Sequence, residues 1–356
     1  MSSANFDGKR ILITGGTGSL GQTLVRRLLT GEMGTPSKIV VFSRDEAKQH
    51  AMRMAYMHRR AATDEVIYRN FQQQLQFSIG DVRDYQSVAG ALRDADIVFN
   101  AAALKQVPTC EYFPYEAVQT NINGPENIVR AIQNQALNVQ TVVGISTDKA
   151  CKPVNVMGMS KAIQERIFIQ ANMRSPRTRF VCVRYGNVLA SRGSVIPLFH
   201  EQIRNGGPVT ITTPEMTRFL LSLDQAVDLI FDAIRHGNPG ETFVPRVPAA
   251  RITDVAAALI GTRNISTQVT GVRPGEKTHE IMVSEEEIFR TEARGNAYVI
   301  LSALPELRGG REPESVLTRE YSSESETMSR SDVEGYLGQH RLMVDDVAAP
   351  EQDLLR

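Results

Sequence analysis

The sequence has few cysteines and no stretch suited to crossing a membrane. Its three cysteines, Cys110, Cys151 and Cys182, are an odd number without CxxC spacing, which argues against a disulfide framework and favours a reducing compartment. No run of about 18 apolar residues is present, and the polar start MSSANFDGKR lacks the apolar core of a signal peptide. We therefore expect a cytoplasmic protein without a membrane span.

An excess of charge of either sign is also missing. The 40 Lys and Arg residues balance the 40 Asp and Glu residues, which argues against nucleic acid as a partner, because bulk attraction to a polyanion requires an excess of cations. The six histidines show no HxxxH or HExxH spacing, so we expect no metal centre. A length of 356 residues with 42% apolar residues is typical of a globular chain with about two domains.

Short apolar segments alternate with amphipathic ones along the first two thirds of the chain. The apolar runs predict strands at 9–14, 38–42, 97–100, 141–146 and 180–184. Helical spacing predicts helices at 124–135, 160–172 and 224–236. Continuous apolar strands alternating with helices predict an α/β fold, a Rossmann-like doubly wound parallel sheet covered on both faces.

A glycine-rich turn joins the first predicted strand to a helical pattern. It reads TGGTGSLG over residues 14–21. Gly15 permits the tight turn, Gly18 lets the backbone approach a pyrophosphate, and Gly21 allows the helix to pack on the strand. The GxxGxxG spacing differs from the commoner GxGxxG, and an ordinary loop is the alternative. Its place between strand and helix favours dinucleotide binding, with Thr17, Ser19 and Leu20 in the same turn.

Two further strand ends bear on the cofactor. An acidic residue after the second strand favours NAD, whereas arginine favours the 2′-phosphate of NADP. Ser43 and Arg44 therefore favour NADP, and Asp45 keeps NAD possible. The segment GDV ends at Val82 and follows another predicted strand. It would place Asp81 near the adenine amino group of the dinucleotide, or it forms a plain turn.

The segment Ser146–Lys149 lies at the carboxyl end of a predicted buried strand, where open α/β sheets bind their ligands. Asp148 and Lys149 there face a cleft or form a solvated pair. Lys161 follows twelve residues after Lys149, and Met157 shares its helix face.

From about residue 189 glycines and prolines punctuate short segments. We predict a dinucleotide-binding domain at 1–188 with about 223–250, and a smaller C-terminal substrate-binding domain at 189–222 and 251–304. The Ser- and Glu-rich remainder, 305–356, is predicted to be a peripheral tail with a helix near 331–339.

Taken together, the motifs resemble those of extended short-chain dehydrogenases/reductases, specifically the UDP-N-acetylglucosamine 4,6-dehydratase group of bacterial polysaccharide biosynthesis. The resemblance runs from residue 11 to about 282 and rests on ILITGGTGSLG, VFSRDEAKQ, GDVRD, NAAALKQVP, TNINGPENIV, STDKACKPVNVMGMSK, RYGNVLASRGSVIPLF, ITTPEMTRFLLS and GVRPGEKTHE. It implies an NADP cofactor, a UDP-sugar substrate and a homo-oligomer.

One departure concerns the Tyr-x-x-x-Lys motif, in which Met157 takes the tyrosine position. A thioether cannot exchange a proton, so a non-catalytic NADP-binding regulator is one alternative. Some members of the group resemble this chain in having Met there with the Asp–Lys pair intact, which favours an active enzyme.

The resemblance implies oxidation at C4 of the sugar, elimination of water across C5 and C6, and return of the hydride to C6. Lys149 would remove the C5 proton and Asp148 would protonate the departing hydroxyl. Lys161 would hold the nicotinamide ribose and, through a water, accept the C4 hydroxyl proton.

Supporting positions follow from the same matches. Those expected beside the cofactor are Ala101, Ala102 and Asn121. Those expected at the substrate are Lys105, Asn187, Arg218, Arg273 and Glu276. The two arginines would pair with the UDP diphosphate, since guanidinium matches phosphate geometry, or form structural ion pairs. Glu276 would accept a hydrogen bond from the uridine ribose.

We predict a 4,6-dehydratase that inverts C5, because compact members with Met resemble the inverting branch, whereas many retaining relatives carry membrane segments. The alternatives are a C5-retaining dehydratase, a UDP-sugar 4-epimerase, or the non-catalytic regulator.

Overall fold

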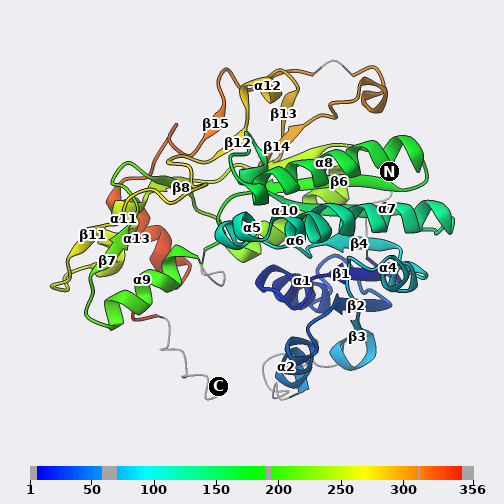
Figure 1. Ribbon diagram of the computed structural model, residues 1–356, viewed down its shortest axis with the longest axis horizontal. Coiled ribbons are helices and arrows are strands. Elements are labelled where there is room, and N and C mark those ends of the chain that lie inside the picture. Colours follow the sequence, from blue (N-terminus) through cyan, green and yellow to red (C-terminus); the bar gives the residue numbers. More distant parts are fainter. Residues whose placement is uncertain (1–5, 58–69, 190–193, 312, 347–356) are drawn as a thin grey trace. The chain divides into compact units, whose positions relative to one another are not determined.

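The structure, a computed structural model, describes residues 6–57, 70–189, 194–311 and 313–346 (Figure 1). The chain forms two compact units. The first contains residues 1–185, 223–246 and 281–321, and the second contains 186–222, 247–280 and 322–356. No helix in the described ranges is both long and apolar enough to cross a bilayer.

A mostly parallel sheet forms the centre of the first unit, which confirms the predicted Rossmann-like class. The strand order is β13-β14-β9-β6-β5-β4-β1-β2-β3. The strands are β1 (Arg10–Thr14), β2 (Lys38–Ser43), β3 (Leu75–Ile79), β4 (Ile97–Asn100), β5 (Thr141–Thr147), β6 (Arg179–Tyr185), β9 (Thr242–Pro245), β13 (Thr291–Arg294) and β14 (Ala297–Ile300). The order reverses between β1 and β4, and ligands of such sheets bind at this switch point.

Helices cover this sheet, with α4, α7 and α8 packed side by side and α1 packed on α10. The helices of the unit are α1 (Ser19–Leu29), α2 (Glu46–Met57), α4 (Tyr85–Leu92), α5 (Val107–Tyr112), α6 (Pro114–Val118), α7 (Gly124–Asn134), α8 (Val156–Arg174), α10 (Leu223–His236) and α12 (Glu285–Ile288). A π-helix spans Gln119–Asn123, and 3-10 turns span Asp148–Ala150 and Pro305–Arg308. The predicted helix at 160–172 is longer at both ends, because Asn155 caps its start by accepting from the Gly158 backbone N–H.

An antiparallel hairpin extends the sheet at one edge. After β12 (Ile281–Val283) and α12, β13 and β14 pair antiparallel, and β14 pairs with β9. The tight turn uses Gly295, whose φ is +60°. The predicted substrate segment 251–304 is therefore divided, because 281–304 folds with the first unit.

The second unit has its own apolar core. Its elements are α9 (Val195–Arg204), β7 (Val209–Ile211), β8 (Thr217–Phe219), β10 (Ala249–Arg251), α11 (Ile252–Ile260), β11 (Thr267–Val269) and α13 (Arg330–Gln339), with β15 (Tyr321–Ser322) at the boundary. Strand β8 pairs with β10 and β7 with β11. Val333 and Leu337 of α13 are fully buried in this core. The predicted helix near 331–339 is thus present as α13, but it is not peripheral, because it carries an apolar face into the core.

Candidate active site

The glycine turn after β1 has little room for side chains. Gly15 has a left-handed φ of +67°, and a Cβ there would lie 2.7 Å from the Ala102 backbone nitrogen. A Cβ on Gly21 would lie 2.5 Å from the Gly16 Cα. At Gly18 a Cβ would come only to 3.4 Å from the Gly15 carbonyl oxygen. The protein's own packing therefore requires glycine at 15 and 21, whereas an open Gly18 suits a surface kept clear for a ligand.

The start of α1 suits an anion. Gly18 is the N-cap residue, and no side chain caps the helix there. The first N–H groups of a helix lack intrahelical acceptors and carry partial positive charge. Gln22 Nε2 donates to the Thr17 carbonyl (2.9 Å), which ties the turn to the first helical residues of α1. These features of residues 15–21 fit the pyrophosphate of a dinucleotide.

Hydrogen bonds join the ends of β1 and β4 at the switch point. Thr14 Oγ1 donates to Asn100 Oδ1 (2.8 Å) and accepts from the Ala102 backbone N–H (3.2 Å). The Ala101 N–H donates to the Thr14 carbonyl (3.2 Å). Asn100 is fully buried, and its Nδ2 donor has no acceptor in the described part of the chain.

Ser43, at the end of β2, and the two residues that follow it differ in how their side chains are bound. Ser43 Oγ lies 3.1 Å from Thr17 Oγ1, beside the turn. The Arg44 side chain is 53% exposed, and its Nη1 lies 3.8 Å from Asp81 Oδ2. Asp45 is hydrogen-bonded to Lys48, and this bond is the main reason why the pKa of the Asp45 carboxyl is lowered. Arg44 is thus more available to a ligand than Asp45 is.

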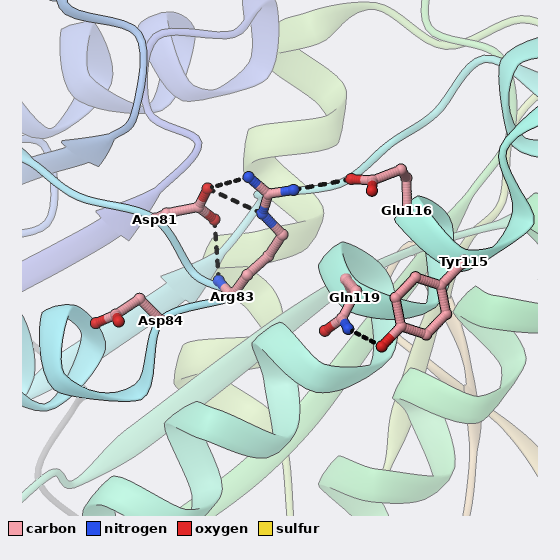
Figure 2. A pocket seen from close by; sticks show the side chains of 6 residues that line it. All are labelled: Asp81, Arg83, Asp84, Tyr115, Glu116 and Gln119. Carbon is pink, nitrogen blue, oxygen red and sulfur yellow. Dashed lines mark hydrogen bonds and ion pairs between the residues drawn. The ribbon is translucent and has the colours of Figure 1, made fainter.

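An open pocket of about 400 Å³ lies beyond the end of β3 (Figure 2). Its lining residues are Asp81, Arg83, Asp84, Tyr115, Glu116 and Gln119. The Arg83 guanidinium lies between Asp81 (2.7 Å) and Glu116 (2.8 Å). Burial alone would raise the pKa of Asp81, but the hydrogen bonds from Arg83 outweigh it and the pKa is lowered. A ligand at Asp81 therefore shares the carboxylate with Arg83, while Val82 is buried in the core.

The Asp–Lys pair lies directly after β5. Asp148 is fully buried, and its Oδ1 accepts from Thr147 Oγ1 (2.8 Å) and from Lys149 Nζ (3.1 Å). The other oxygen, Oδ2, has no partner among the described residues. The Lys149 side chain is 20% exposed. An acid and an amine thus lie in contact at the carboxyl end of the sheet.

Lys161 lies on α8 with only 5% of its surface exposed. Its Nζ donates to Gln164 Oε1 (2.6 Å), and Gln164 Nε2 donates to the Ile145 carbonyl of β5 (3.0 Å). Burial penalises the charged amine and lowers its pKa from 10.5 to about 8. The amine is therefore held near β5, and its pKa lies well below that of an exposed lysine.

Met157 lies in an apolar cluster with Cys110 and Ala117, and it is 5% exposed. Its thioether cannot supply the proton donor or acceptor that a tyrosine hydroxyl would supply. Asn121, in the π-helix, accepts from the Leu104 N–H (2.8 Å) and donates to the Leu104 carbonyl (2.9 Å) and to Ser160 Oγ (2.9 Å). It thereby fixes the loop that presents the exposed Lys105.

Two residues of this site escaped the sequence prediction. Thr147 donates to Asp148, and its place at the end of a strand was the available signal. Gly158 allows α8 to approach the preceding segment, since a Cβ there would lie 2.2 Å from the Lys149 carbonyl oxygen. The sequence shows the glycine in MGMSK, but it does not show that this glycine approaches the Lys149 carbonyl.

The remaining predicted residues belong to the second unit. Arg218 is 6% exposed, its Nη1 donates to the carbonyls of Thr217 (2.7 Å) and Thr278 (3.0 Å), and its Nε lies 3.7 Å from Glu280 Oε1. Arg273 is exposed, and its backbone N–H donates to Glu276 Oε2 (3.3 Å). Asn187 is half-buried. Arg218 thus has structural partners, whereas the Arg273 side chain reaches solvent. Nowhere in the described ranges do three or more His, Cys, Asp or Glu residues form a group suited to a metal ion.

Known proteins are similar to this chain in sequence and in fold. The family described as "Polysaccharide biosynthesis protein" matches residues 11–302. A protein of Rickettsia typhi named UDP-glucose 4-epimerase is 47% identical over 301 residues, 83% of each chain. The X-ray structure of Pen from Bacillus thuringiensis has a TM-score of 0.84 and 32% identity, covering 95% of this chain and 99% of that one. The dTDP-glucose 4,6-dehydratase DesIV from Streptomyces venezuelae, with NAD and TYD bound, has a TM-score of 0.63 at 20% identity and covers 76% of this chain and 86% of its own, which shows the fold alone.

Proposed function

Because the chain belongs to the polysaccharide biosynthesis protein family, an extended short-chain dehydrogenase/reductase family, we propose that it is a UDP-N-acetylglucosamine 4,6-dehydratase. One observation carries the proposal: Asp148 and Lys149 form a contacting acid–amine pair at the end of β5, and a buried Asp148 oxygen has no partner in the described chain. An elimination of water needs such a pair, whereas an epimerisation at C4 does not.

The cofactor proposed is NADP, and the turn at residues 15–21 would hold its pyrophosphate. Arg44 would pair with the 2′-phosphate, because its side chain is exposed while Asp45 is engaged by Lys48. Bound there, the cofactor would supply the hydride acceptor for C4 of the sugar and the hydride donor for C6. NAD remains the alternative, with Asp45 as the ribose partner.

The proposed proton chemistry uses this chain's own groups. Lys149 removes the C5 proton, and Asp148 donates a proton to the departing C6 hydroxyl, which leaves as water. When the hydride returns to C6, C5 takes up a proton that has exchanged with solvent. The proton released from the C4 hydroxyl balances the one that Asp148 gave to the water. The 3.1 Å contact between Asp148 and Lys149 lets the pair exchange a proton between the two steps. Lys161, with its pKa lowered to about 8 by burial, accepts the C4 hydroxyl proton through a water, since Met157 cannot.

In the second unit we propose that Arg273 contacts the UDP diphosphate and Glu276 the uridine ribose, because both lie on one turn. Arg218 would contribute after exchanging a carbonyl partner. Asn187, and Lys105 from the first unit, would contact the sugar. We also propose inversion at C5, on the resemblance of the Met157 pattern to the inverting branch. The H5 coupling in the NMR spectrum of the fresh product tests that assignment. The homo-oligomeric state stays a prediction that light scattering tests.

Incubating purified protein with UDP-N-acetylglucosamine and NADP tests the reaction. Dehydration gives a product lighter by one water in the mass spectrum. In deuterated water, wild type should incorporate deuterium at C5, Lys149→Ala should lose that incorporation, and Lys9→Ala, just before β1, should keep it. Incorporation unchanged in Lys149→Ala would refute the base assignment.

A 4-epimerase is the second candidate, favoured by the name of the Rickettsia relatives. It would convert the UDP-sugar without a change of mass. A product of equal mass that differs only at C4 would establish it over the dehydratase.

A further inference from the structure

A buried arginine bridges two buried carboxylates near the Asp148–Lys149 pair. Arg184 of β6 donates from Nη2 to Glu165 Oε2 of α8 (2.7 Å) and from Nε to Glu165 Oε1 (3.0 Å). It also donates from Nη1 to Glu287 Oε2 of α12 (2.7 Å) and from Nη2 to Glu287 Oε1 (3.1 Å). All three residues are at most 7% exposed. Buried charges are costly unless they are fully paired, so this arrangement requires all its members.

The bridge extends to the chain on both sides of the catalytic pair. Ser146 Oγ, just before Thr147, donates to Glu165 Oε1 (2.5 Å). Cys151 Sγ, two residues after Lys149, donates to Glu287 Oε2 (3.8 Å). We call Ser146, Glu165, Arg184, Glu287 and Cys151 the Arg184 network. One set of buried groups thus contacts residues before and after Asp148 and Lys149.

A second contact holds the next residue. Lys152 has a left-handed φ of +44°, which non-glycine residues rarely adopt. Its Nζ donates to Glu320 Oε2 (2.7 Å) and lies 3.8 Å from Glu285. Glu285, Glu287 and Glu320 all come from residues 281–321, the segment that adds the hairpin to the sheet. This segment therefore supplies the carboxylates that meet the chain after the catalytic pair.

We propose that the Arg184 network positions Asp148 and Lys149 for catalysis, with Glu287 of the 281–321 segment as a positioning residue. The inference rests on the proposed function, because it concerns the same pair. A displacement of about 1 Å at a catalytic group can cost about a hundredfold in rate. Fixing both flanks of the Asp148–Ala150 turn by charged hydrogen bonds limits such displacement.

If the Arg184 network had a purely structural role, its variants would lower the stability of the protein without changing the reactivity of Asp148 and Lys149. Ser146→Ala removes one hydrogen bond and leaves the charges paired, and Glu287→Gln keeps the shape of the side chain. Thr178→Val is the matched control. Thr178 is buried, and its hydroxyl donates to the Val139 carbonyl (2.7 Å). This bond lies where β5 and β6 begin, whereas Ser146 and Arg184 lie near the ends of the same two strands.

Two measurements on the full chain test the proposal. The first is kcat and KM for dehydration of UDP-N-acetylglucosamine with NADP. The second is the rate at which acetic anhydride acetylates Lys149 across a pH series, read by peptide mass spectrometry. In Ser146→Ala and Glu287→Gln, kcat should fall at least about tenfold with KM within about twofold, and the midpoint of Lys149 acetylation should move. Thr178→Val should change neither, even where it lowers the melting temperature.

The proposal is overturned if Ser146→Ala leaves both kcat and Lys149 acetylation at wild-type values, or if Thr178→Val alters them equally. Should Glu287→Gln fail to fold, Ser146→Ala decides. If wild type converts no UDP-N-acetylglucosamine, the proposed function fails, and the acetylation series alone judges the network, because it needs no turnover.

Discussion

The buried amine of Lys161 should destabilise the protein at neutral pH relative to a variant without it. Burial lowers the pKa of Lys161 from 10.5 to about 8. Between these two pH values the unfolded chain binds more protons than the folded chain, so the free energy of unfolding rises with pH. The penalty is fully present below pH 8 and disappears as the pH approaches 10.5.

The size of this penalty follows from the two pKa values. The difference from about 8 to 10.5, at about 1.4 kcal/mol per pH unit, gives about 3–4 kcal/mol. Replacing Lys161 by Met removes it but leaves the Gln164 oxygen without its donor (2.6 Å in the wild type), which costs about 1–3 kcal/mol. That second cost does not depend on pH, so a comparison across pH separates the two.

Urea unfolding of wild type and Lys161→Met, at about pH 7 and about pH 10, measures the effect. The stability of the variant relative to wild type should be about 2–3 kcal/mol more favourable at the lower pH. Other titrating groups are common to both proteins and cancel in the difference. A difference that is the same at both pH values would refute the reasoning that burial lowers the pKa of Lys161.

Three further substitutions have direct outcomes. Gly158→Ala places a Cβ 2.2 Å from the Lys149 carbonyl oxygen and should lower kcat about a hundredfold. Its control Gly90→Ala, which meets nothing within 4 Å in α4, should keep kcat and gain about 0.5–1 kcal/mol; equal kcat in the two would contradict the contact. Arg44→Ala should raise the Kd of NADP at least about tenfold with the Kd of NAD unchanged in calorimetry, and equal losses for both would remove Arg44 from the 2′-phosphate. Val333→Ala in α13, fully buried, should cost about 1–2 kcal/mol in thermal unfolding, and no cost would contradict its place in the core.

The first half of the fold was predictable because its determinants are local. Strand β1, the turn at Gly15 and helix α1 lie within residues 10–29, and each was visible as an apolar run, a glycine or a 3.6-residue period. The predicted strand 97–100 coincides with β4, and 38–42 falls one residue short of β2. Parallel order follows from strands that alternate with helices.

Features that depend on distant partners were not predictable in the same way. Arg184 and Glu287 are 103 residues apart in the sequence, and nothing local marks them as a pair. Arg218 was expected at a diphosphate or in a structural ion pair, and its guanidinium contacts two carbonyls and lies 3.7 Å from Glu280. The packing of α13 depends on a core contributed by α9 and α11. In each case the residue type was visible, while its partner was fixed only by the fold.

The surroundings of Met157 limit how this site can move protons. Its side chain packs with Cys110 and Ala117, and its thioether cannot exchange a proton. In the proposed mechanism the proton chemistry then falls to Asp148, Lys149 and Lys161. Among them Lys161 is the amine that burial brings to a pKa of about 8, where both protonation states are populated. The desolvation that destabilises the fold is therefore the same property that would let Lys161 take over the role of the missing phenol.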